Sequence, residues 1–95
     1  MKFRKKPVIV DAVQFTKDST AEIRSFVPNP WYQGFCYVDG DNNISDKPTS
    51  KMGLKLKTLE SQIFIAQEGD WIIKGVSGEF YACKPDIFDE TYEKV

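Results

Sequence analysis

The second half of the chain alternates short apolar segments with glycine turns, and this rhythm constrains the fold more than any other feature. Segment 54–59, LKLKTL, places leucines on one face and lysines on the other, as in a half-buried strand. Three further apolar segments follow it: QIFIAQ (62–67), WIIKGV (71–76) and EFYACK (79–84). Gly69-Asp70 and Ser77-Gly78 separate them, and such turns join antiparallel neighbours. The pattern predicts an antiparallel meander of four strands.

The first half adds two more strands. Residues 8–15, VIVDAVQF, are apolar on both faces and interrupted by Asp11, a pattern typical of a central or barrel strand. We expect Asp11 to be buried beside a partner or exposed at an edge. A further strand is predicted over 33–38, after a proline-rich turn.

Two helices are predicted, one in each half of the chain. The first begins at Ser19, where Glu22 completes a capping box, and ends before Pro28. Its apolar residues recur at helical spacing. The second is short and begins at Pro85, a residue that the first turn of a helix accepts.

These elements fit one domain over residues 1–95. The apolar fraction of 41% supports a modest core. We therefore predict an α+β fold: a small antiparallel sheet or partly closed SH3-like barrel of about five to six strands, with one helix in the N-terminal half and a short C-terminal helix. Residues 39–51 are polar and without period, which indicates a long loop that is functional or mobile.

Charge is balanced overall but segregated along the sequence. The net charge of −1 gives no strong case for DNA or RNA as a partner. Residues 1–59 carry ten Lys and Arg against six Asp and Glu, and residues 60–95 carry three against eight. The two ends therefore attract one another, within a monomer or between chains, which permits a homo-oligomer.

Compartment is inferred from the cysteines and the apolar runs. Cys36 and Cys83 are too few for a disulfide framework, so we expect reduced thiols. No run approaches the roughly 20 apolar residues of a membrane helix, and none resembles a signal peptide. We expect a cytoplasmic protein without a membrane partner.

Catalytic and metal-binding patterns are weak. The chain has no histidine, which removes the commonest general base and most zinc sites. The loop at 39–50 starts like a calcium loop, but Ile44 and Ser50 stand where glycine and glutamate are needed. A hydrolase using Asp11 or Asp70 is the least favoured alternative. We expect no catalytic residue, metal or cofactor.

Aromatic residues give the best binding signal. One group follows the first helix beside the polar loop, and another lies on the predicted 71–81 hairpin near two lysines. Aromatics beside cations can stack a base and hold a phosphate, but aromatics also build cores. The candidate partner- or ligand-binding residues are Trp31, Tyr32, Phe35, Trp71, Lys74, Tyr81 and Lys84.

Two segments carry a resemblance to a known family. MKFRKKPVIVDAVQF (1–15) and GDWIIKGVSGEFYACKPDIFDETY (69–92) together resemble the PGDYG family of small phage and prophage proteins, which is named after its turn motif. Here residues 68–71 read Glu-Gly-Asp-Trp in place of Pro-Gly-Asp-Tyr, so a turn followed by an aromatic is retained but the tyrosine hydroxyl is lost. The resemblance implies a phage accessory protein in the bacterial cytoplasm and carries no activity over.

The leading hypothesis is a non-enzymatic phage binding protein that engages a host component, as an anti-defence or host-takeover factor. Its contact region would be segment 31–51 with the hairpin from Trp71 to Tyr81. One alternative is a sponge for a small nucleotide signal, using Lys74, Lys84 and the basic run 4–6. Another is a structural homo-oligomeric phage protein.

Overall fold

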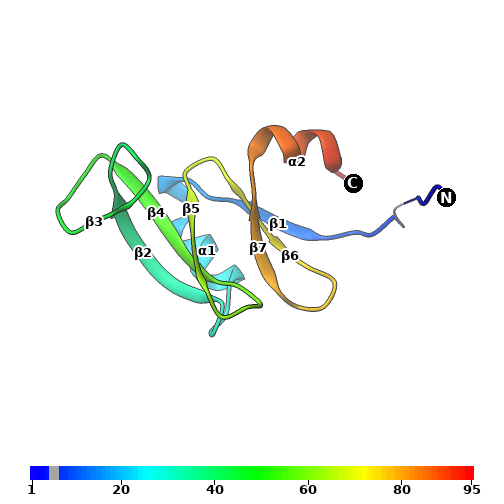
Figure 1. The fold of residues 1–95 in the computed structure, drawn as a ribbon, viewed down its shortest axis with the longest axis horizontal. Helices are drawn as coiled ribbons and strands as arrows, with labels where there is room; N and C mark the ends of the chain where they lie inside the picture. Colours follow the sequence, from blue (N-terminus) through cyan, green and yellow to red (C-terminus); the bar gives the residue numbers. More distant parts are fainter. Residues whose placement is uncertain (5–6) are drawn as a thin grey trace.

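The structure, a computed structural model, describes residues 1–4 and 7–95 and confirms the predicted α+β class (Figure 1). One sheet is curled into a half-barrel, in line with the partly closed barrel that the sequence predicts. The strands are β1 (Asp11–Gln14), β2 (Tyr32–Val38), β3 (Ile44–Ser45), β4 (Lys51–Lys57), β5 (Ile63–Gln67), β6 (Trp71–Lys74) and β7 (Phe80–Cys83). The helices are the 3-10 turn η1 (Lys17–Ser19), α1 (Thr20–Phe26) and α2 (Pro85–Thr91).

The strands form two antiparallel sheets. One has the order β1-β6-β7 and the other the order β3-β2-β4-β5. The predicted meander through β4, β5, β6 and β7 is therefore wrong in one pairing, because β5 and β6 lie in different sheets. The short strand β3 lies within the predicted polar loop and pairs with the end of β2.

The chain changes sheets at the corner from Gln67 to Trp71. Asp70 N donates to Gln67 O at 3.0 Å and closes a turn, in which Gly69 has a φ of +97°. Phe15, just after β1, forms two backbone hydrogen bonds with this corner. Its N–H donates to Asp70 O, and its carbonyl accepts from Gly69 N. Because these groups are already paired with Phe15, the chain leaves the corner beside β1 and not beside β5.

The central strand is β6, not the N-terminal strand. Ile72 and Ile73 point to opposite faces and are both fully buried. β1 lies at the edge of its sheet, so of the two predictions for residues 8–15, a central or a barrel strand, the central one is wrong. Asp11 is exposed at this edge, which is one of the two places expected for it. Both faces of β6 are covered, which is what an apolar strand of this kind requires.

The first helix begins three residues earlier than predicted, as a 3-10 turn. Thr16 is its cap: the Thr16 hydroxyl accepts from Asp18 N, and Thr16 N donates to the Ser19 hydroxyl. Ser19 itself makes no cap bond to α1. The predicted apolar stripe is confirmed, with Ile23 and Val27 buried in the core.

The core lies between the two sheets and α1. Its buried members are Phe15, Ile23, Val27, Leu54, Leu56, Ala66, Ile72 and Phe80. Helix α2 covers the outer face of the β1-β6-β7 sheet, where Phe88 stacks on Trp71 at 4.3 Å with nearly parallel rings. The β1-β6-β7 sheet is thus a middle layer, fixed from both sides.

Candidate partner-binding groove

The three aromatics beside the first helix belong to the core. Trp31, Tyr32 and Phe35 are half-buried and pack against the buried cluster. Phe35 lies 5.8 Å from the ring of Phe15, and Trp31 lies 6.4 Å from that of Phe80. Their packing explains why these residues are aromatic.

The residues predicted on the hairpin lie apart from that group. Trp71 stacks on Phe88 of α2, and the Tyr81 hydroxyl lies 3.4 Å from that of Tyr92. This hydrogen bond, then burial and neighbouring groups, raises the pKa of Tyr81 to about 12. Lys74 is exposed at the other end of β6.

Lys84 is engaged at the corner, not free for a ligand. Its Nζ lies 3.3 Å from Oδ1 of Asp70, whose side chain is 4% exposed. Oδ2 of the same carboxylate accepts from Gln67 N at 2.9 Å. The structure therefore distributes six of the seven candidate residues over the core, the α2 layer and the corner. It leaves Lys74 at the far end of β6, and it does not gather the seven around one pocket.

The polar loop is held by its own hydrogen bonds. Oδ1 of Asp39 accepts from Asp41 N and Asn43 N, and Asn42 takes a left-handed φ of 63°. The Thr49 hydroxyl donates to Val38 O at 2.7 Å and ties the far end of the loop to β2. No cluster of three metal-ligating side chains occurs in residues 1–4 and 7–95.

The two thiols do not pair with each other. Cys36 and Cys83 are free and half-buried. Burial, with the carboxylates of Asp70 and Asp86 adding to it, raises the pKa of the Cys83 thiol. At neutral pH the reactive thiolate of Cys83 is therefore disfavoured.

A groove of about 400 Å³ lies where the two sheets fail to join. β5 ends one sheet and β7 ends the other, and the groove is bounded by both strands and by the β4–β5 turn. Its apolar lining consists of Leu56, Leu59, Phe64, Phe80 and Ala82, with Tyr81 beside them. This groove could not be predicted from the sequence, because the predicted meander joined β5 and β7 in one continuous sheet.

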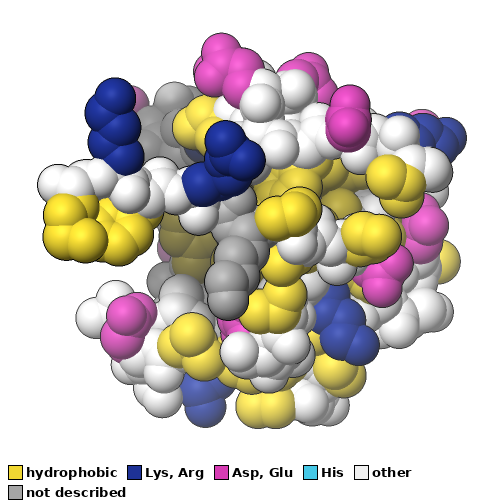
Figure 2. Space-filling view, turned by 90° about the vertical axis from the view of Figure 1, so that its right-hand side faces the viewer, with side chains coloured by type: hydrophobic (Ala, Val, Ile, Leu, Met, Phe, Trp, Pro, Cys, Tyr) yellow, Lys and Arg dark blue, Asp and Glu magenta, His cyan; other side chains and the backbone are white. Residues whose placement is uncertain are grey.

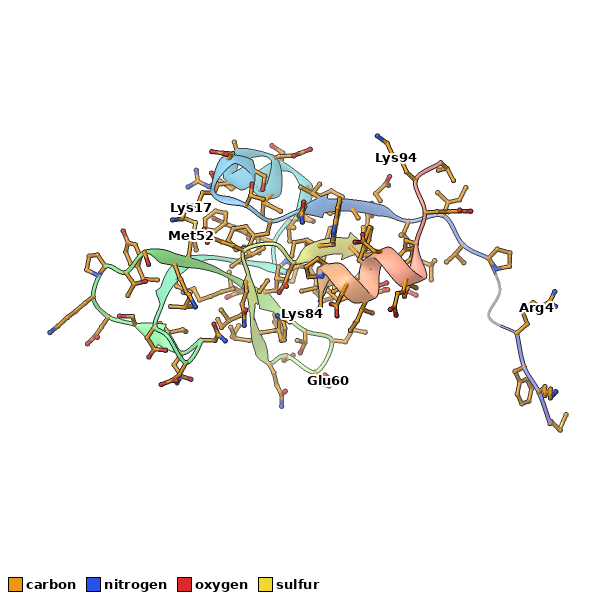
Figure 3. All side chains as sticks on the ribbon, turned by 90° about the horizontal axis from the view of Figure 1, so that it is seen from above. Arg4, Lys17, Met52, Glu60, Lys84 and Lys94 are labelled. Atoms are coloured by element: carbon orange, nitrogen blue, oxygen red, sulfur yellow. The ribbon has the colours of Figure 1, made fainter. Side chains whose placement is uncertain are left out.

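Two carboxylates belong to the groove. Glu60 lies at the β4–β5 turn (Figure 3), and Glu79 directly precedes β7. The Glu79 side chain folds back over Gly75, in the space that a Cβ there would occupy. Its Oε2 is buried and accepts no hydrogen bond from any described residue. A buried acceptor of this kind is normally paired, and a cation, an N–H group or a water molecule can supply the bond.

No helix among the described residues is long and apolar enough to cross a bilayer. A scan against protein-family models matched none, and searches of curated proteins and of solved structures returned no match. The resemblance to the PGDYG family stays a prediction, and the function has to rest on the geometry of the groove.

Proposed function

We propose that the chain is a non-enzymatic binding protein that takes an extended segment of a partner protein into the groove between β5 and β7. The observation that carries this proposal is that two unpaired strand edges share one apolar groove. An added strand is a common way of recognising peptides, since main-chain hydrogen bonds supply affinity and side-chain pockets supply specificity.

The edges supply the hydrogen bonds. A strand at the end of a sheet carries a row of unpaired N–H and C=O groups. β7 is bonded to β6 on one side, and β5 to β4 on one side. A segment running along β7 satisfies its free edge and brings alternate side chains over Phe64 and Phe80.

The carboxylates set the chemistry of the partner. Glu60 and Glu79 border an apolar lining, and the Oε2 of Glu79 lacks a donor. A segment with an apolar residue followed or preceded by Lys or Arg fits both features, because a charged donor forms a stronger hydrogen bond than a neutral one. The resemblance to phage proteins makes this partner a host component in the bacterial cytoplasm.

The test is selection from a random peptide library displayed on a carrier, followed by affinity measurement with the selected synthetic peptides. We expect peptides in which apolar residues alternate and a basic residue flanks them. Leu59→Asp should weaken their binding at least tenfold, since Leu59 borders the groove and is 73% exposed. Val76→Asp is the matched control: Val76 is 75% exposed and lies outside the groove lining.

Either of two results contradicts the proposal. One is equal loss of binding in both variants, which would indicate a general effect of added negative charge. The other is a nucleotide, retained through purification and released on denaturation, whose binding is unaffected by Leu59→Asp. That result favours the nucleotide-sponge alternative.

A further inference from the structure

The N-terminal arm, residues 1–4, is separated from the body of its own chain. It extends beyond the end of the β1-β6-β7 sheet, and Figure 3 shows Arg4 far from the helices. Met1 is fully exposed and Phe3 is 88% exposed. Ile9, between the arm and β1, is 80% exposed. A phenylalanine and an isoleucine left in water make this end an unpartnered surface.

The amount of exposed surface supports the same conclusion. A compact monomer of 10.9 kDa exposes about 5,600 Å². This chain exposes 7047 Å² and measures 49 Å along its longest axis. The excess, about 1,500 Å², reflects an extended arm added to a compact body.

A second cleft opens at the same end, between residues 8–12 and helix α2. Its volume is about 660 Å³. Val8, Val10, Trp71, Phe88 and Tyr92 contribute apolar surface to its lining. Figure 2 views this end and shows hydrophobic side chains interspersed with acidic ones.

Charge complements the arm. Lys2 and Arg4 make the arm basic, whereas α2 and the residues after it carry Asp86, Asp89, Glu90 and Glu93. Asp89 and Glu93 line the cleft and are exposed. Lys94 is the one cationic residue in that lining. The cleft therefore offers apolar surface to Phe3 and negative charge to its basic neighbours.

A two-fold axis allows both arms to be exchanged at once. The cleft lies at the end of the molecule from which the arm extends, and residues 8–12 form one of its sides. In a two-fold dimer both copies use the same surface, so each copy contributes one arm and one cleft. The arm of each copy can therefore enter the cleft beside α2 of the other.

We propose that this end is a self-association surface, on which two copies exchange their N-terminal arms. Phe3 of each copy lies in the cleft beside α2 of the other, and Arg4 faces the acidic residues Asp89 and Glu93. This site is distinct from the β5–β7 groove and does not depend on the peptide-binding function.

The first test is sedimentation equilibrium of the full chain over a range of concentrations at low and moderate salt. We expect a monomer–dimer equilibrium that weakens as salt rises, because the arm is held partly by charge. Phe3→Asp should weaken dimerisation at least tenfold. Val76→Asp, the same substitution at an exposed apolar residue away from this end, should leave it unchanged.

The decisive test is a charge exchange. Arg4→Glu and Glu93→Arg should each weaken the dimer, and the double variant should recover most of the lost affinity. Since both residues are exposed, neither change should alter the melting temperature of the monomer. A monomer at all concentrations overturns the proposal. A dimer that survives Phe3→Asp, or a double variant that fails to recover, overturns the exchange of arms.

Discussion

Asp70 and Glu79 occupy matching places, each just before a strand of the β6–β7 hairpin and each followed by an aromatic residue. Their surroundings differ. The Asp70 carboxylate is almost fully buried, accepts from Gln67 N and lies beside Lys84 Nζ. The Glu79 carboxylate has a buried oxygen without a donor in the described chain. One carboxylate is paired within the chain, and the other has an oxygen that no described residue pairs.

This difference suggests separate roles for the two carboxylates. A satisfied buried carboxylate fixes the corner at which the chain changes sheets. A buried acceptor that no described residue pairs contributes no such bond to the fold. We therefore expect substitutions at Asp70 to affect folding, and substitutions at Glu79 to affect binding.

The largest expected loss of stability tests the packing of the β6–β7 hairpin, which carries both carboxylates. Phe80 is buried between the sheets and packs against Phe26 and Trp31. Phe80→Ala should lower the free energy of unfolding by about 3–5 kcal/mol, measured by urea denaturation. Val76→Ala in the same hairpin should change it little, because Val76 is exposed. Unchanged stability in Phe80→Ala would show that the hairpin does not pack as described.

Asp70→Ala should have the next largest effect. It removes the acceptor of Gln67 N and the partner of Lys84, so we expect a loss of about 1.5–3 kcal/mol in unfolding free energy. Lys84→Met removes only the ion pair. Because the Lys84 side chain is 47% exposed, its loss should be below about 1 kcal/mol. Equal effects of the two substitutions would mean that the hydrogen bond to Gln67 does not hold the corner.

Glu79→Met tests the second carboxylate of this comparison. Methionine fills a similar volume over Gly75 and has no oxygen to satisfy. The unfolding free energy should stay the same or rise by about 1 kcal/mol, since an unpaired buried acceptor is removed. Affinity for a basic peptide should fall at the same time. A clear loss of stability would show that Glu79 already has a partner and would remove its support for a binding role.

Local sequence patterns predicted most elements correctly. The alternation of Leu54, Lys55, Leu56 and Lys57 predicted a strand with one buried face, and the structure confirms it. The turn at Gly78 has the left-handed backbone that favours glycine, with φ of +85°. Such features depend on neighbours in sequence, which is why they can be read without a structure.

Pairings between distant segments could not be predicted. Whether the chain after Gly69 runs beside β5 or beside β1 depends on the backbone of Phe15, which is remote in sequence. The groove depends on this pairing. β5 and β7 each end a sheet because β5 and β6 do not pair. The aromatic signal included Trp31 and Tyr32, whose place against the core depends on contacts between distant segments.

The contact between Tyr81 and Tyr92 gives the smallest prediction, and its sign follows from the pKa. An ordinary tyrosine has a pKa near 10, and that of folded Tyr81 is raised to about 12. The unfolded chain therefore loses this proton first. The stabilising contribution is fully present below pH 10 and is lost as pH rises towards 12.

Tyr81→Phe should change the unfolding free energy at pH 7 by less than about 1 kcal/mol, because the Tyr81 side chain is partly exposed. Between pH 10 and 12 the stability of the variant should fall less steeply than that of the parent chain, as measured by urea denaturation. Cys83 titrates with the same sign in both proteins, so its effect cancels in the difference. Identical slopes would mean that the hydroxyl of Tyr81 is not held by Tyr92.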